Sequence, residues 1–155
     1  MDQKEHHYSH SHEPGHEHQH HGDYEEEERK KWNSNAGIYV NSHERYTLTA
    51  GITLGNMLEL TKSKRIIEVG CGPGGLSLFW LPQLREAEKY VSLDFSEKMI
   101  ELAEHRKKQL PHLNDKIEHK FVVGDMNDLS AYADGSFDTY LACLAIHHSF
   151  DPKKA

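Results

Sequence analysis

The sequence lacks the features that would assign it to several common classes of protein. It contains only two cysteines, Cys71 and Cys143, and neither belongs to a CxxC pair or a Cys/His finger. We therefore expect two free thiols, with neither a disulfide framework nor a structural zinc site. No stretch has eighteen uninterrupted apolar residues, and the first thirty residues lack the apolar core of a signal peptide. These absences predict a soluble, cytoplasmic protein with no membrane association.

Charge is also scarce outside the N-terminal segment. The net charge is -7, and residues 1–30 hold nine acids against three bases, whereas residues 31–155 hold sixteen acids against fifteen bases. Lys and Arg are scattered through this larger part, which offers no electrostatic surface to a nucleic-acid backbone. A chain of 155 residues is long enough for one domain. We expect a single core and no nucleic-acid partner.

The N-terminal segment has a composition typical of disordered chains. Residues 5–21 contain eight of the fourteen histidines, and an acidic run follows. Because such a segment cannot bury enough apolar surface to offset the entropy lost on ordering, we expect residues 1–31 to be disordered. The histidines are consistent with capture of zinc, copper or nickel and also with a solvated tail. Their spacing encodes no fixed ligand geometry, so we assign no metal site.

Hydrophobic periodicity divides the rest of the chain into helices and strands. Between about residues 43 and 60, apolar residues such as Leu48 and Ile52 recur at helical spacing, so we expect residues 32–64 to be a helical lead-in. The expected strands cover residues 65–69, 90–93, 118–123 and 137–146, and the expected helices between them cover residues 76–84 and 96–110, the latter capped by Ser96. This alternation predicts an α/β fold, a Rossmann-like doubly wound parallel sheet with helices on both faces.

The stretch EVGCGPGGL follows the first expected strand and opens a helix. Its glycines allow a tight turn and a close approach of the backbone to a ligand, and the helix that follows offers unpaired N–H groups. A nucleotide-like ligand is the natural occupant. The spacing Gly70-x-Gly72-x-x-Gly75 also satisfies the dinucleotide fingerprint, with Asp94 where an acidic ribose ligand is expected. The turn by itself therefore leaves the cofactor open.

Acidic residues at three expected strand ends narrow the choice of cofactor. Glu68 lies where a dinucleotide domain usually has an apolar residue, and a cationic cofactor would supply the partner that a buried carboxylate needs. Asp94 can accept from both ribose hydroxyls, with Phe95 or Met99 against a flat ring. Asp125 is an acceptor suited to an exocyclic amine. Since ligands of open α/β sheets bind at the carboxyl ends of the strands, these groups describe a pocket for an adenosyl group with a positively charged tail.

With these motifs the chain resembles the class I S-adenosylmethionine-dependent methyltransferases, and in particular the small-molecule group called methyltransferase type 11. The resemblance runs from about residue 66 to residue 152 and includes EVGCGPGG, SLDFSEKMIELA, VVGDM and FDTYLACLAIHH in the family's order. It implies S-adenosyl-L-methionine as the cofactor, a small-molecule methyl acceptor, and strands in the order 3-2-1-4 as the N-terminal half of the class I methyltransferase fold.

The resemblance also implies a role for individual residues. The residues expected to bind the cofactor are Glu68, Gly70, Cys71, Gly72, Gly74, Asp94, Phe95, Met99, Asp125 and Met126. By resemblance, Glu68 and the glycine turn surround the methionine part, Asp94 binds the ribose, and Asp125 holds the adenine edge. Alternatives stay open, because Met99 and Cys71 also fit a hydrophobic core and the two aspartates also fit turn caps.

The fourth expected strand ends in His147 and His148, beside the place where the family binds its acceptor. Either histidine can act as a base, orient the substrate, or simply begin a polar loop. Methyl transfer from a sulfonium needs mainly alignment of acceptor and methyl group, so help from a base is optional. The sequence lacks the Asn/Asp-Pro-Pro-aromatic run of enzymes that methylate the exocyclic amines of bases, which disfavours nucleic-acid substrates.

The sheet of this family has seven strands, and the sequence ends just after the fourth, so we expect an incomplete domain over residues 65–155. Its fourth strand would be an exposed edge, available to a protein partner or to self-association. The favoured function is methyl transfer from S-adenosylmethionine to a small molecule. Two alternatives are a catalytically inactive cofactor-binding or interaction module and an NAD-dependent oxidoreductase, against which Glu68 and Asp125 argue.

Overall fold

The computed structural model describes residues 17–110, 113 and 115–153, with side chains from residue 22 onward. Its helices are α1 (Glu17–Ser42), α2 (Glu44–Met57), α3 (Gly75–Trp80) and α4 (Glu97–Lys108), and its strands are β1 (Arg65–Val69), β2 (Lys89–Asp94), β3 (Glu118–Val123) and β4 (Thr139–Ala142). Short 3₁₀ turns cover Leu60–Lys62, Leu81–Gln83 and Ile146–His148. Within the described ranges, no helix combines the length and the apolar character needed to span a membrane.

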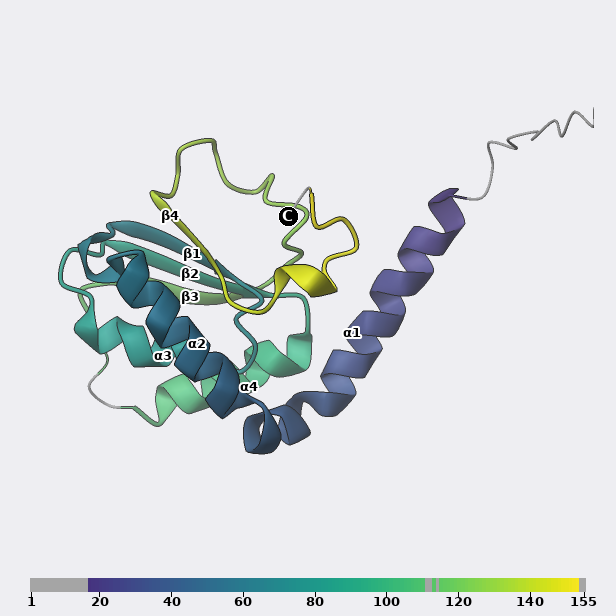
Figure 1. Ribbon diagram of the computed structural model, residues 1–155, viewed down its shortest axis with the longest axis horizontal. Coiled ribbons are helices and arrows are strands. Elements are labelled where there is room, and N and C mark those ends of the chain that lie inside the picture. Colours follow the sequence, from purple (N-terminus) through teal and green to yellow (C-terminus); the bar gives the residue numbers. More distant parts are fainter. Residues whose placement is uncertain (1–16, 111–112, 114, 154–155) are drawn as a thin grey trace, which may run out of the picture.

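The four strands form one parallel sheet in the order β3-β2-β1-β4 (Figure 1). This order confirms the one that the resemblance implies. Val69 of β1 pairs with Leu93 of β2 and with Ala142 of β4, so the carboxyl ends of these three strands lie side by side. The glycine turn, the turn after β2 and the loop after β4 therefore meet at one rim of the sheet. Among the described strands, β3 and β4 form the two edges.

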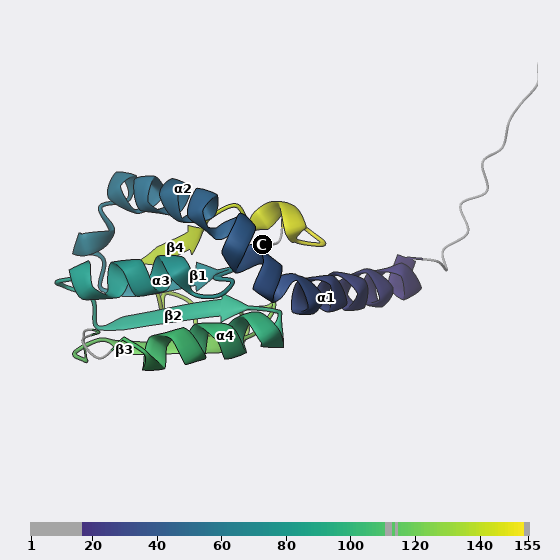
Figure 2. The same ribbon diagram turned by 90° about the horizontal axis from the view of Figure 1, so that it is seen from below.

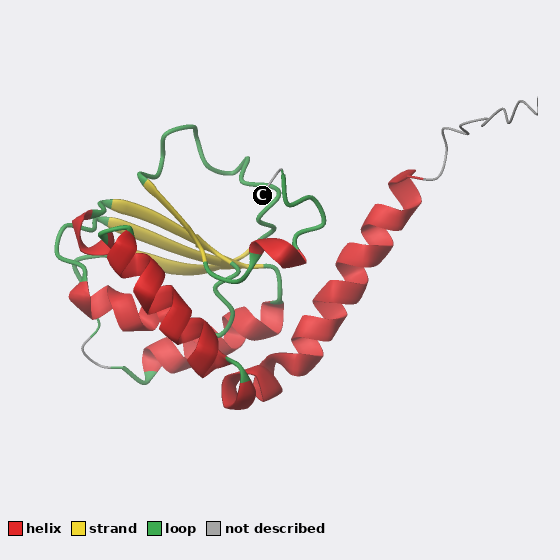
Figure 3. Ribbon diagram, viewed as in Figure 1, coloured by secondary structure: helices red, strands yellow, loops and turns green. Residues whose placement is uncertain are grey.

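Helices cover one face of the sheet and a loop covers the other. The larger core lies between the sheet and helices α2, α3 and α4 (Figure 2), and its central side chains include Ile66, Tyr90 and Leu141. On the opposite face, Ile67 and Val91 pack beneath residues 124–138, which form a loop rather than a helix (Figure 3). The expectation of helices on both faces thus holds for one face of the described structure. The loop is rich in Asp, Asn, Ser and Gly, which favour turns over helix.

The fourth strand is shorter than its apolar sequence predicted. Residues 137–146 were expected to be extended, but β4 ends at Ala142. The backbone then turns at Leu144, whose φ is +51°, and enters the 3₁₀ turn Ile146–His148. A positive φ is incompatible with a continuing strand. The strands β1 and β3 have the predicted bounds, and Ser96 caps α4 by accepting a hydrogen bond from the Met99 N–H.

The expectation of a disordered N-terminal segment is wrong from residue 17 onward, because α1 begins at Glu17. Ion pairs along the helix, Lys30–Glu26 at 2.5 Å and Lys31–Glu28 at 2.8 Å, support it locally. Packing of α1 against α4 supplies tertiary contacts that composition alone does not reveal. Residues 1–16 lie outside the described residues, as do the side chains of residues 17–21. The histidines of residues 5–21, to which no metal site was assigned, thus lie outside the described side chains.

Candidate functional site

A cavity of about 600 Å³ opens at the rim where β1, β2 and β4 end. Its floor comes from the glycine turn and from the turn after β2, and its walls come from α1 and from residues 143–148. The position is the one where open α/β sheets bind ligands. The volume lies within the range of roughly 300–1,000 Å³ that is usual for small-molecule sites. We therefore take this cavity, the rim cavity, as the candidate site.

The glycine turn brings bare backbone to the floor of the rim cavity. Gly72 has a φ of +53°, and a Cβ added there would have only Tyr39 within 4 Å, at 3.8 Å. The backbone at this point is therefore open to a ligand. Gly70 also lines the cavity, but a Cβ there would lie 2.4 Å from the Cβ of Ala145, so this glycine permits the close approach of the loop after β4.

Asp94 closes the floor beside this turn. Its side chain is buried, with Oδ2 accepting the Gly72 N–H at 2.8 Å and Oδ1 accepting the Ser96 N–H at 2.9 Å. Burial raises the pKa of Asp94, and the two backbone bonds oppose that rise. Each carboxylate oxygen keeps a further lone pair. Asp94 thus both caps turns and remains able to accept hydrogen bonds from a diol in the cavity.

Glu68 does not face the rim cavity. It is 3 % exposed, and its Oε2 accepts from the Ser77 hydroxyl at 2.6 Å and from the Tyr90 hydroxyl at 2.8 Å. Burial raises its pKa to about 7. Two protein hydroxyls thus already act as partners of one carboxylate oxygen, so the burial of Glu68 does not by itself require a cationic cofactor, and cofactor binding by Glu68 stays a prediction.

The other residues predicted to bind the cofactor, from the glycine turn and from the turn after β2, fall into two groups. One group lines the rim cavity, and the other is packed in the core. Phe95 and Met99 line the rim cavity, and Met99 is also fully buried, so it is both core and cavity wall. Cys71 and Gly74 do not line it. A Cβ on Gly74 would lie 2.6 Å from Phe121, and burial raises the pKa of the Cys71 thiol well above its ordinary value. The structure places these two positions in the packing beneath the turn.

Asp125 and Met126 lie outside the rim cavity. They border a separate gap of about 30 Å³ whose opposite side is formed by α1, through side chains that include Glu28 and Arg29. One oxygen of Asp125 accepts the Asn127 N–H at 2.8 Å, so this aspartate caps its own turn. Phe95 borders both spaces and is the bridge between them.

His147 and His148 both line the rim cavity, in the 3₁₀ turn after β4. Their ring centroids are 3.9 Å apart, and the ring of His148 meets the edge of Trp32 with centroids 5.0 Å apart. Burial, and then the neighbouring His147, lower the pKa of His148. This shift favours the neutral imidazole, which can accept a proton or a hydrogen bond.

Sequence reasoning missed the contribution of α1 and α2 to the site. The cavity residues from these helices and from the junction between them are Trp32, Asn35, Ile38, Tyr39, His43 and Thr47. The Tyr39 hydroxyl lies 2.8 Å from the Thr47 hydroxyl, which ties the end of α1 to α2. Trp32 and Tyr39 are seven residues apart, a spacing that puts both on one helical face. That spacing indicates an aromatic helical face, but hydrophobic periodicity predicted only a helical lead-in for residues 32–64.

No group of three or more His, Cys, Asp and Glu side chains suited to a metal ion is found where the structure describes side chains. Of the residues that line the rim cavity, none is Lys or Arg, and Asp94 is the single carboxylate. The cavity therefore combines a glycine backbone floor, one acidic acceptor, aromatic rings and imidazoles. This set fits a nucleoside with a compact charged tail better than it fits a polyanion.

Comparison with known proteins agrees with this geometry. A family model described as a methyltransferase domain matches residues 67–155. Among curated proteins, none matches the sequence of the chain. One similar solved structure is a protein from Methanococcus maripaludis assigned as an S-adenosyl-L-methionine-dependent methyltransferase, with 23 % identity and a TM-score of 0.60, covering 81 % of this chain and 54 % of that one.

A second similar structure is magnesium protoporphyrin IX methyltransferase from Synechocystis with bound S-adenosylhomocysteine, at 22 % identity and a TM-score of 0.59. The match covers 77 % of this chain and 58 % of that one, so this chain spans little more than half the length of both structures. At such identities the likeness establishes the fold. The family match runs over more than half of the sequence and decides against an NAD-dependent oxidoreductase. The chain belongs to the family of class I methyltransferase domains, whose cofactor is S-adenosylmethionine.

Proposed function

We propose that this chain supplies the cofactor-binding half of a methyltransferase that acts on a small-molecule acceptor. The observation that carries the proposal is the rim cavity, which joins the Gly72 backbone, the Asp94 carboxylate and the His147–His148 pair in one space. S-adenosylmethionine, when bound, supplies a methyl group on a positively charged sulfur. The rest of the chemistry falls to binding, alignment and exclusion of water.

The residues of the floor suit the parts of this cofactor. Asp94 has acceptor capacity left for the two ribose hydroxyls, and the open backbone at Gly72 suits the methionine part. Phe95 and Met99 offer an aromatic ring and a polarisable thioether to the faces of an adenine. Cys71, Gly74 and Glu68 would act from beneath, by shaping the turn rather than by touching the ligand.

The walls of the rim cavity suit the acceptor. Trp32, Ile38 and Tyr39 present mainly apolar surface, which would keep water away from the reacting groups. In the neutral form that its lowered pKa favours, His148 can take the proton that an acceptor hydroxyl, thiol or ammonium loses, or hold that group in line by a hydrogen bond. The absence of Lys and Arg among the lining residues supports a small acceptor over a nucleic acid.

The cofactor assignment is tested by Asp94→Ala with isothermal titration calorimetry of S-adenosylmethionine. Loss of hydrogen bonds to a charged group should weaken binding by about 1–3 kcal/mol. The matched control is Asp138→Ala, because Asp138 also accepts two backbone N–H groups, from Lys64 and Arg65, but lies at the opposite end of β1. Binding that is equally strong in wild type and Asp94→Ala would remove Asp94 from the cofactor site.

Methyl transfer itself is tested with S-adenosylmethionine labelled on the methyl group and a panel of small acceptors bearing hydroxyl, thiol or amine groups. Transfer that falls in His148→Gln, while cofactor affinity is kept, would support a role for this imidazole at the acceptor. Cofactor binding with no transfer to any acceptor would instead favour a binding module without catalysis.

A further inference from the structure

The N-terminal half of α1 lies over the ledge formed by Phe95, Asp125 and Met126. The gap that remains between the ledge and the helix is about 30 Å³, bordered on the helix side by residues that include Tyr24 and Glu28. This volume is about a tenth of the roughly 300 Å³ at which small-molecule sites begin. No purine ring fits into this gap while α1 lies in its present position.

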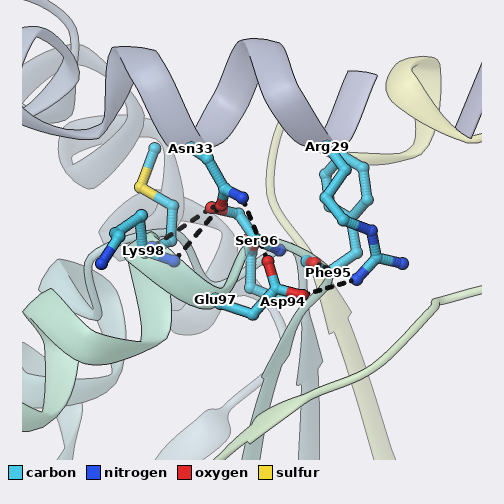
Figure 4. A network of polar contacts seen from close by, with 8 residues as sticks. Arg29, Asn33, Asp94, Phe95, Ser96, Glu97 and Lys98 are labelled. Carbon is cyan, nitrogen blue, oxygen red and sulfur yellow. Dashed lines mark hydrogen bonds and ion pairs between the residues drawn. The ribbon is translucent and has the colours of Figure 1, made fainter. Parts of the chain in front are cut away.

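Polar contacts hold α1 on the turn that carries Asp94 (Figure 4). A terminal nitrogen of Arg29 donates to the Phe95 carbonyl and pairs with Glu97, both at 3.0 Å. The side-chain oxygen of Asn33 accepts from the Ser96 hydroxyl at 2.6 Å, and its nitrogen donates to Glu97 at 3.1 Å.

The Arg29–Glu97 pair is weak enough to break. The two side chains are 39 % and 48 % exposed, and exposed ion pairs contribute little to stability. An aromatic contact also fixes α1 to the domain, since the rings of Tyr24 and Phe150 have centroids 5.8 Å apart. Trp32 also meets the ring of His148, so opening separates this aromatic pair as well.

A point of low helix stability separates this half of α1 from the half that is fixed to the domain. Gly37 lies inside α1, is exposed, and has no atom within 4 Å of where a Cβ would stand. Glycine in a helix interior destabilises the helix relative to alanine. Beyond it, Tyr39 is anchored by its hydrogen bond to Thr47 of α2. The segment before Gly37 can therefore move while the segment after it stays in place.

We propose that residues 22–36 of α1 form a cover over the adenine end of the cofactor site, with Arg29 and Asn33 as its latch and Gly37 as its hinge. The rim cavity is open beside the cover, but the cover must lift from Phe95, Asp125 and Met126 before the adenine edge of S-adenosylmethionine or S-adenosylhomocysteine can reach Asp125. When it closes again over the adenine end, the latch bonds to the turn that carries Asp94, beside the ribose. The proposal rests on the proposed function, because it takes these molecules as the ligands.

Stopped-flow fluorescence of S-adenosylhomocysteine binding tests the cover. Trp32 lines the rim cavity and reports on the site, whereas Trp80, the second of the two tryptophans, is buried in the core. Arg29→Ala should raise the association rate constant about five- to tenfold, because it removes one hydrogen bond and one exposed ion pair. Gly37→Ala should lower that rate constant, because a stiffer helix opens less often.

The matched control is Lys30→Ala, which removes the same charge one residue along the helix. Lys30 pairs with Glu26 of α1, both side chains being well exposed, so its loss should leave the association rate constant unchanged. Far-ultraviolet circular dichroism of each variant establishes that α1 is still helical. Gly37→Ala keeps the test decisive if Arg29→Ala should unfold the segment.

The possible outcomes separate the cover from the function on which it rests. Equal association rate constants in wild type, Arg29→Ala and Gly37→Ala, with ligand bound by all three, would overturn the cover and leave the cofactor site standing. A change confined to the dissociation rate constant would also overturn it, since α1 would then be a static wall. If no variant and no wild-type protein binds S-adenosylhomocysteine, both the proposed function and the cover are wrong.

Discussion

Replacing Glu68 by glutamine should make the stability of this protein much less dependent on pH. Glu68 is buried between β1 and α3, and a single oxygen accepts from both Ser77 and Tyr90. Glutamine has nearly the same shape and keeps an oxygen for these two hydroxyls, but it cannot ionise. The substitution therefore removes the ionisation of the buried group and preserves its packing.

The magnitude follows from the pKa of Glu68, which burial raises from 4.5 to about 7. The folded protein holds this proton more tightly than the unfolded chain, so the free energy of unfolding falls as the pH rises from below 4.5 to above 7. The whole change corresponds to about 3 kcal/mol, of which about 2.5 kcal/mol lies between pH 5 and pH 8. The free energy of unfolding of Glu68→Gln should not fall in this way as the pH rises.

The assay is urea unfolding of both proteins at several pH values from 5 to 8. A group such as His119 titrates in both proteins, so its contribution cancels in the difference between the two curves, whereas Asp94 interacts with the Glu68 charge and its contribution cancels only in part. If the new amide changes the free energy of unfolding by the same amount at every pH, the difference shifts by a constant and its dependence on pH is unaffected. Two parallel curves would refute the reasoning, because Glu68 would then ionise in the folded protein as readily as in the unfolded chain. Glu101→Gln, on the exposed face of α4, is the control that should leave the curve unchanged.

Two further predictions concern the turns around the site. Gly74→Ala should lower the free energy of unfolding by about 3 kcal/mol, because the new methyl would meet Phe121 and the residue would keep a φ of +77°. Gly135→Ala, with a φ of +71° but open space around it, should cost only about 1 kcal/mol in the same urea titration. Ser96→Ala should cost at least about 1 kcal/mol by removing the cap on the Met99 N–H together with the bond from the Ser96 hydroxyl to Asn33, measured as a lower midpoint of thermal unfolding. An equal cost at both glycines would contradict the packing argument, and an unchanged midpoint would contradict the cap.

Much of the α/β framework could be predicted from local sequence. β1 and β3 have the predicted bounds because β-branched and aromatic residues are concentrated there and turn residues bound them. The cap at Ser96 was predicted for the same reason, since a cap depends on residues within one turn of helix. The glycine turn and Asp94 were found together because parallel strands bring their carboxyl ends to one rim.

Local sequence patterns could not predict the contacts between segments that lie far apart in the chain. β4 stops early because Leu144 adopts a positive φ as the loop packs over Gly70, a conformation that no local pattern encodes. Asp125 was expected in the cofactor pocket, yet the present position of α1 separates it from the rim cavity. A search by periodicity assigns faces to helices, but it does not say which partner each face meets.

The sequence by itself determined the alternation of strands and helices, the glycine turn and the acidic residue after β2, because each depends on neighbours a few positions away. Only the tertiary structure decided that Glu68 bonds to two hydroxyls and that α1 lies over the ledge beside Phe95. Both depend on which side chains meet across separate elements, and burial and long-range packing set those meetings.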